Sequence, residues 1–129
     1  MKRILIIEDD FYIRDIYYKS LSEADYQVDI AVDGTEGLKK IKGHTYDLIL
    51  LDIMLPKLSG IDLLKIFRKP GSPTVNTPIY LITNLGQDNI IQQAFKIGAD
   101  GYLLKAQLDP HDLVKEVDIL FRELESVNK

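Results

Sequence analysis

Side chains capable of metal binding and phosphate chemistry follow successive apolar runs in this 129-residue sequence. Three carboxylates, Glu8, Asp9 and Asp10, come directly after Ile4–Ile7, and a single aspartate follows Leu48–Leu51. A threonine and a lysine follow the next two apolar runs of this kind. Each of these residue types is common on a protein surface when it occurs alone. Their joint placement after four apolar runs indicates a site, made of Glu8, Asp9, Asp52, Thr83 and Lys105.

The chemistry open to this set is metal-dependent phosphoryl transfer. Mg²⁺ takes oxygen ligands and is typically held by one or two carboxylates together with phosphate oxygens. A carboxylate can also be a nucleophile that forms an aspartyl-phosphate. A threonine hydroxyl and a lysine ammonium can contact the remaining phosphoryl oxygens. Such a site needs no histidine as a general base, and we interpret His44 and His111 as residues without a catalytic role.

Five short apolar runs are the candidate strands. Three of them are continuous rather than alternating, which is typical of a parallel sheet covered on both faces. The expected strands are Ile4–Ile7, Val28–Val32, Leu48–Leu51, Ile79–Ile82 and Tyr102–Leu104.

Segments with helical spacing lie between and after these runs. Apolar residues at steps of three and four predict one helix through Ile13, Ile16, Tyr17, Leu21 and Ala24, and another through Leu113, Val117, Leu120, Phe121 and Leu124. A capping-box spacing at Asp33–Glu36 predicts a helix that opens near Thr35. Asp109 and Pro110 have the order of an N-cap and a first helical residue. Gly60–Phe67 and Asn89–Ile97 are the remaining helical candidates.

The alternation of strands and helices predicts an α/β fold with helices on both faces of a parallel sheet. With five strands and right-handed crossovers, we expect the flavodoxin-like strand order 2-1-3-4-5. Ligands of such sheets bind outside the carboxyl ends of the strands. The candidate residues should therefore meet at one edge. We interpret Arg68–Thr77 as a surface loop before the fourth strand.

The composition and charge of the chain exclude or disfavour several kinds of site and partner. The chain has no cysteine, which excludes disulfides and thiolate metal sites. A net charge of -4 argues against non-specific nucleic-acid binding. The apolar runs are too short for a secretory signal or a membrane span. We expect a single cytoplasmic domain over residues 1–126, with a short polar tail at 127–129.

Four motifs carry a resemblance to a known family: ILIIEDD, LILLDIMLPKLSG, YLIT and GADGYLLK. From about Lys2 to about Leu124, the chain resembles the CheY-like receiver domain of two-component response regulators. The resemblance implies that Asp52 accepts a phosphoryl group from a histidine kinase or a histidine phosphotransfer protein. It implies a signalling domain rather than an enzyme, although one that assists its own phosphorylation and dephosphorylation.

The resemblance also implies a metal site and a switch. Asp9 and Asp52 would ligate Mg²⁺ (or Mn²⁺) directly, Glu8 would act through water, and the backbone carbonyl of Met54 would be a further ligand. The other implied roles are phosphoryl binding by Thr83 and Lys105 and an aromatic switch at Tyr102. Movement of the threonine and rotation of the tyrosine would repack the face formed by the fourth helix, the fifth strand and the fifth helix, to which an unknown downstream protein would bind. We expect a stand-alone receiver, monomeric or weakly dimeric, that does not itself bind nucleic acid.

Three positions depart from the family pattern. Ala106 follows Lys105 where the family has proline, and a cis bond before a non-proline residue costs about 2.5–4 kcal/mol. Asn84 stands where the family favours a small residue. Met54 and Leu85 are both apolar at positions that tune the phosphoryl lifetime, so we expect slow self-dephosphorylation.

Two other functions remain open from the sequence. A phosphorylation-independent interaction module would keep the fold. Such a module would be expected to lose the acid pair (Glu8 and Asp9), Asp52 or Lys105. A metal-dependent phosphohydrolase usually has a second aspartate two residues after its nucleophile, where this chain has Met54. A nucleotide-binding function is disfavoured because neither GxxxxGK[ST] nor GxGxxG occurs.

Overall fold

A computed structural model describes residues 1–84, 88–105 and 109–127 of the chain. Strands and helices alternate through these residues, as the sequence predicts. The elements are β1 (Arg3–Ile7), α1 (Phe11–Glu23), β2 (Gln27–Ala31), α2 (Gly34–Gly43), β3 (Leu48–Asp52), α3 (Gly60–Phe67), β4 (Ile79–Thr83), α4 (Asp88–Ile97), β5 (Gly101–Leu104) and α5 (Pro110–Val127). Residues 128–129 of the expected tail lie outside the described part.

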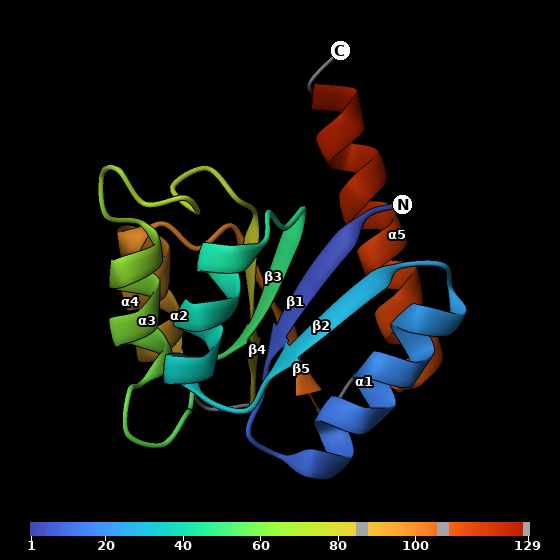
Figure 1. Ribbon diagram of the computed structural model, residues 1–129, viewed down its shortest axis with the longest axis horizontal. Coiled ribbons are helices and arrows are strands. Elements are labelled where there is room, and N and C mark those ends of the chain that lie inside the picture. Colours follow the sequence, from blue (N-terminus) through green and yellow to red (C-terminus); the bar gives the residue numbers. More distant parts are fainter. Residues whose placement is uncertain (85–87, 106–108, 128–129) are drawn as a thin grey trace.

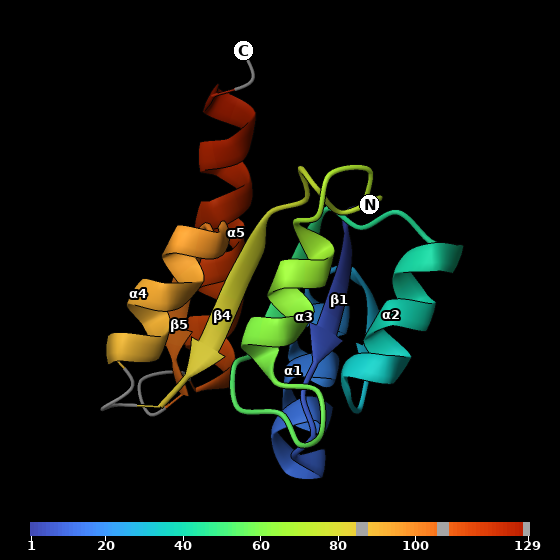
Figure 2. The ribbon, with the colours of Figure 1, turned by 90° about the vertical axis from the view of Figure 1, so that its left-hand side faces the viewer.

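The strands form one parallel sheet in the order β2-β1-β3-β4-β5, which confirms the predicted fold class. Helices α1 and α5 cover one face, and α2, α3 and α4 cover the other (Figure 1). The strand arrowheads point to one end of the molecule, away from the labelled N- and C-terminal ends (Figure 2). That end is the edge where the candidate residues were expected. None of the described helices has both the length and the apolar character to cross a membrane.

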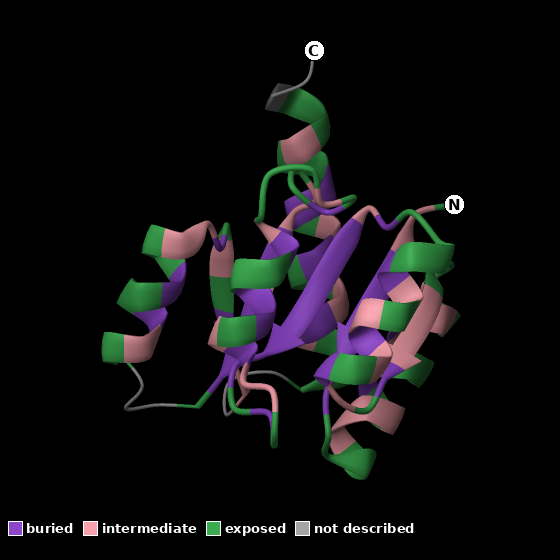
Figure 3. Cartoon of the chain, turned by 60° about the vertical axis from the view of Figure 1, so that its left-hand side comes forward, coloured by how far each residue is buried: buried purple, intermediate pink, exposed green. Residues whose placement is uncertain are grey.

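Side chains of the inner strands alternate between two apolar clusters. Ile4 and Ile6 of β1 pack with α1 and α5, whereas Leu5 and Ile7 pack with α2, α3 and α4. Strand β3 is buried along all five residues, and the inner strands are coloured as buried in Figure 3. This two-sided burial explains why the apolar runs in the sequence are continuous.

Side-chain caps fix where helices begin. Oδ1 of Asp33 accepts a hydrogen bond from the backbone N–H of Glu36 at 2.8 Å, as the capping-box spacing predicts. Oδ1 of Asp109 accepts from the N–H of Asp112 at 2.8 Å, and α5 begins at the following proline. A carboxylate at the N-cap satisfies one of the free N–H groups of the first turn. Both predicted helix starts lie within one residue of the observed ones.

A few sequence expectations differ from the structure. The expected strand Val28–Val32 ends at Ala31, because the chain turns there into the Asp33 cap of α2. Strands β3 and β4 include Asp52 and Thr83 as their last residues rather than ending before them. Ile16 was expected on the buried stripe of α1 but is 44% exposed. It lies about 100° around the helix from Tyr17, which faces the core.

Candidate functional site

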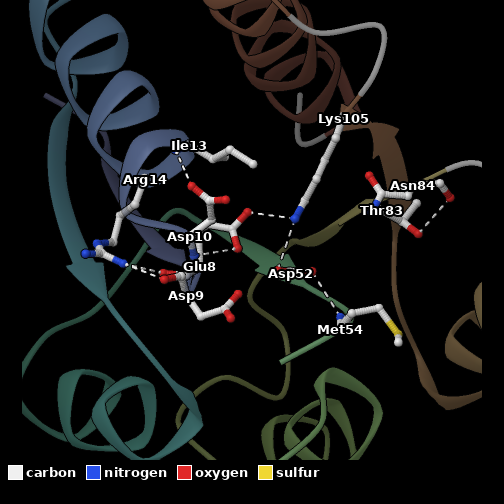
Figure 4. A network of polar contacts seen from close by, with 10 residues as sticks. All are labelled: Glu8, Asp9, Asp10, Ile13, Arg14, Asp52, Met54, Thr83, Asn84 and Lys105. Carbon is white, nitrogen blue, oxygen red and sulfur yellow. Dashed lines mark hydrogen bonds and ion pairs between the residues drawn. The ribbon is translucent and has the colours of Figure 1, made fainter. Parts of the chain in front are cut away.

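The predicted site residues meet at the carboxyl edge of the sheet. Glu8 directly follows β1, Asp52 ends β3, Thr83 ends β4, and Lys105 directly follows β5. The close-up in Figure 4 shows these side chains around one space, with Asp52 between the acid pair and Thr83. The parallel register is the physical reason, because it brings the ends of neighbouring strands to one level.

Lys105 bridges two buried carboxylates. Its Nζ lies 2.8 Å from Oε1 of Glu8 and donates a hydrogen bond to Oδ2 of Asp52 at 3.1 Å. The side chains of Glu8 and Asp52 are almost completely inaccessible to solvent, and that of Lys105 is 16% exposed. Buried charges persist only when they are paired. The lysine therefore compensates much of the negative charge at the site.

Lys105 does not fully compensate the negative charge at Glu8. Burial, reinforced by the hydrogen bond and negative charge of Asp52, raises the pKa of the Glu8 carboxyl to about 8, although Lys105 acts in the opposite direction. Burial by itself would lower the pKa of the Lys105 ammonium, but the hydrogen bond to Glu8 and the charges of both carboxylates outweigh it and raise that pKa. A further cation is therefore electrostatically favoured here.

Glu8, Asp9 and Asp52 can supply such a cation with ligands. Each offers one carboxylate oxygen, and these three oxygens lie within 4.8 Å of one another. Asp9 is exposed, so the cluster is open to solvent on its side. An all-oxygen donor set suits a hard divalent cation such as Mg²⁺ or Mn²⁺ and leaves room for water ligands. The residues present therefore fit the predicted metal.

The backbone after β3 contributes to the site. The N–H of Met54 donates a hydrogen bond to Oδ1 of Asp52 at 3.0 Å. The two oxygens of Asp52 thus have different partners, one a backbone amide and the other Lys105. The use of the Met54 carbonyl as a metal ligand remains a prediction. The Met54 side chain is exposed beside the site.

The two predicted switch residues occupy different environments. Thr83 is buried, and its hydroxyl donates to the carbonyl of Asn84 at 3.3 Å. Tyr102 is 45% exposed, and its ring lies edge-on to Phe95 of α4 with centroids 6.2 Å apart. The tyrosine thus rests against α4 on the surface.

Several other expectations concern residues around this centre. His44 and His111 are exposed, and the interpretation that neither is catalytic remains a prediction. Asn84 is exposed at the end of β4. Leu85 and Ala106 lie outside the described residues, so the expectations about the apolar flank and the Lys105–Ala106 peptide remain untested.

Arg14 belongs to the site but was not predicted from the sequence, and the capping role of Asp10 was not predicted either. Nη1 of Arg14 donates to the backbone carbonyls of Glu8 at 2.9 Å and Asp9 at 3.3 Å. Asp10 accepts a hydrogen bond from the N–H of Ile13 at 3.1 Å and thereby caps α1. The available signal was the three-residue spacing from Asp10 to Ile13, which is that of an N-cap. No comparable rule links an arginine to carbonyls five or six residues before it.

Taken together, the fold and this edge define a class of protein: a parallel α/β domain with a buried aspartate, two neighbouring carboxylates and a lysine at the carboxyl ends of its strands. The sequence profile of the response regulator receiver domain matches residues 4–118. The chain belongs to this family, the receiver domains of two-component signalling.

Individual relatives support this family assignment. Regulatory protein VanRB of Enterococcus faecalis is 40% identical over 120 residues, which cover 93% of this chain and 52% of VanRB. Transcriptional regulatory protein DltR of Streptococcus agalactiae is 41% identical over 103 residues, which cover 80% of this chain and 45% of DltR. The chain therefore spans about half the length of the curated relatives it matches.

Solved structures show the same fold over the whole domain. A two-component response regulator from Clostridium difficile has a TM-score of 0.86 at 31% identity, covering 96% of this chain and 98% of that one. Chemotaxis protein CheY4 of Vibrio cholerae has a TM-score of 0.84 at 30% identity, covering 92% and 97% respectively. These similarities confirm the family predicted from the motifs.

Proposed function

We propose that this receiver domain stores its signal as a phosphoryl group on Asp52. One observation carries the assignment: Asp52 is buried at the end of the central strand, with Lys105 on one oxygen and the Met54 amide on the other. Its carboxylate also belongs to the three-oxygen cluster with Glu8 and Asp9. Family membership supports the type of reaction, and this geometry supports Asp52 as the acceptor.

Phosphorylation is a displacement at phosphorus. A carboxylate oxygen of Asp52 forms the new O–P bond while the P–N bond to the donor histidine breaks, and the histidine nitrogen keeps that electron pair. Mg²⁺ held by Glu8, Asp9 and Asp52 would supply positive charge against the phosphoryl oxygens. The Lys105 ammonium, already 3.1 Å from Asp52, neutralises negative charge from the opposite side. These groups are how the domain would assist its own phosphorylation and dephosphorylation.

The phosphorylated state differs from the free state by charge. A phosphoryl group adds roughly -1.5 to -2 charges and strong acceptor oxygens. Thr83 and Lys105 are the hydroxyl and ammonium donors placed to bind those oxygens. As Thr83 turns toward the phosphate, the Tyr102 ring leaves Phe95 and rotates inward. This is a shift in population between two packings of the surface formed by α4, β5 and α5.

The partners follow from this chemistry. The proposed donor is a histidine kinase or a histidine phosphotransfer protein, and the proposed location of the domain is the cytoplasm. The output is a protein that distinguishes the two packings of the α4–β5–α5 surface. The domain acts as a monomer or weak dimer in this proposal, and nucleic acid is not contacted directly.

The test is the intact mass of the protein after treatment with acetyl phosphate and Mg²⁺. Wild type should gain the mass of one phosphate, and Asp52→Asn should gain none. Asp25→Asn is the matched control, because Asp25 is exposed in the turn after α1 at a φ of 71°, which asparagine tolerates. A wild-type protein that never gains phosphate, or an Asp52→Asn variant that gains it equally, contradicts the proposal. The first result would favour an interaction module that works without phosphorylation.

A further inference from the structure

Arg14 makes contacts that none of the roles described so far explains. Its Nη1 atom donates to the backbone carbonyls of Glu8 at 2.9 Å and Asp9 at 3.3 Å. These are consecutive carbonyls, and they belong to the two acidic residues that precede α1. Figure 4 shows the guanidinium on the side of this segment away from Asp52. Through these hydrogen bonds Arg14 holds the backbone of the acid pair rather than its carboxylates.

Arg14 is itself held firmly. Its backbone N–H donates to the carbonyl of Asp10 at 3.0 Å, in the turn that Asp10 caps. Its Cζ atom lies 5.6 Å from the centroid of the Phe11 ring, within the range of a cation–π contact. The planar guanidinium suits such stacking together with several hydrogen bonds. The arginine therefore ties the acid pair to the first turns of α1.

Other contacts hold the same segment from the sheet side. The N–H of Glu8 donates to the carbonyl of Ala31 at 3.0 Å, which continues the pairing of β1 with β2. The N–H of Asp10 lies 3.4 Å from Oε2 of Glu8. At the next residue, Asp9, the side-chain contact that the structure describes for the backbone carbonyl comes from Arg14. Asp9 is also the exposed member of the carboxylate cluster.

We propose that Arg14 is a positioning residue that preorganises Glu8 and Asp9 for the divalent cation. This inference rests on the proposed function for the identity of the ligand. Arg14 touches neither the cation nor the phosphoryl group, and it acts through the backbone that carries the two carboxylates. Outer partners that orient metal ligands typically contribute 10–100-fold to metal affinity.

A simpler explanation is that Arg14 only balances the charges of its acidic neighbours. The two explanations predict opposite results for a neutral substitution. If Arg14 acts only as a positive charge, its removal should strengthen cation binding, because a repulsive charge is lost. If it positions the acid pair, its removal should weaken cation binding despite that electrostatic gain. The sign of the change therefore separates them.

The experiment compares Mg²⁺ binding by wild type, Arg14→Met and Arg14→Lys, using isothermal titration calorimetry. We expect Arg14→Met to bind about 10-fold more weakly. Arg14→Lys keeps the charge but lacks the planar fork, so partial recovery is expected. Arg122→Met is the matched control, because Arg122 is exposed on α5. The affinity of this variant for Mg²⁺ should equal that of wild type. Unchanged or tighter binding by Arg14→Met overturns the inference.

A second measurement does not depend on the cation. In EDTA, amide hydrogen exchange of Asp9 and Asp10 should be faster in Arg14→Met than in wild type, while exchange within β3 should be unchanged. Equal exchange of the Asp9 and Asp10 amides in the two proteins overturns the inference even if affinity falls. If Arg14→Met does not fold, Arg14→Lys decides by the same two measurements. Wild type that binds no Mg²⁺ would contradict the proposed function, while the exchange result would still test Arg14.

Discussion

Glu8 has a carboxylate that solvent does not reach, and its protonation is coupled to the state of the site. Its exposed fraction is 0%, and Lys105 contacts one of its oxygens at 2.8 Å. Burial and the neighbouring Asp52 carboxylate raise its pKa to about 8, from an ordinary value of 4.5. The folded, metal-free protein therefore takes up a proton that the unfolded chain releases at neutral pH.

This difference sets the pH dependence of stability. The pKa of Glu8 is raised in the folded state, so this carboxyl group stabilises the folded protein while it is protonated there. Its contribution to the free energy of unfolding is fully present below pH 4.5 and is lost as the pH rises through about 8. In EDTA, the free energy of unfolding should fall across this window, by no more than about 1.4 kcal/mol per pH unit for one proton. Urea denaturation at a series of pH values measures it.

Glu8→Gln is the appropriate comparison, because it keeps the shape of the side chain and cannot ionise. Its free energy of unfolding should change less with pH over the same interval. Identical slopes for wild type and variant would show that the raised pKa does not belong to Glu8.

Individual site residues differ in how far the sequence reveals them. Asp52, Thr83 and Lys105 were identifiable because each lies at the end of an apolar run, and the fold rule then places them together. Arg14 was not identifiable in this way. Its role depends on a long side chain that turns back across the segment between β1 and α1. Tyr102 was recognised as the switch position by resemblance alone, and its contact with Phe95 depends on how α4 packs beside β5.

At the scale of the elements, Gly60 allows α3 to begin directly against the end of β3. A Cβ atom at this position would lie 2.5 Å from Cα of Ile53 and 2.8 Å from the carbonyl oxygens of Asp52 and Ile53. All three are backbone atoms, which cannot move aside as a flexible side chain can. The backbone at Asp52 and Ile53 and the start of α3 are thus in direct contact through this glycine.

Gly60→Ala should therefore destabilise the protein by about 1–3 kcal/mol, the usual cost of forcing extra volume into a packed region. Gly43→Ala provides the control within another helix, because a Cβ atom there meets nothing within 4 Å. That change should stabilise by about 0.4–1 kcal/mol through the unfolded chain. Chemical denaturation of both variants gives the two values, and a neutral Gly60→Ala would refute the close approach.

The elements themselves were largely predictable. Every expected strand and helix is present in the described residues, and most ends agree within one or two positions. The errors have local causes. Val32 lies outside β2 because the following cap at Asp33 turns the chain, and Ile16 is exposed because α1 packs on one stripe only. Apolar character indicates that a residue can be buried, but the geometry of the turn decides whether it is.

At the scale of the whole molecule, the metal site joins elements that are far apart in the chain. Glu8 and Asp9 follow β1, and Asp52 ends β3, so a bound cation would link the ends of two neighbouring strands. A ligand that binds only the folded state stabilises it by mass action. The stability of this domain should therefore report occupancy of the site directly.

Mg²⁺ at 100 times its dissociation constant should raise the free energy of unfolding by about 2.7 kcal/mol. The same concentration should have much less effect on Asp9→Asn, which removes an exposed ligand and leaves the core unaltered. Thermal denaturation in MgCl₂, with NaCl of equal ionic strength as the reference, measures the difference. Equal stabilisation of wild type and Asp9→Asn would place the cation elsewhere.

Strand β3 lies in the middle of the sheet and is buried along all five residues. Consecutive side chains of this strand pack into the two apolar clusters, with Leu50 in one and Leu51 in the other. Any displacement of this strand would disturb both layers of the domain at once. A phosphoryl group on its final residue would therefore be attached to a strand packed on both faces, and the conformational response would be expected in the more exposed segments around it.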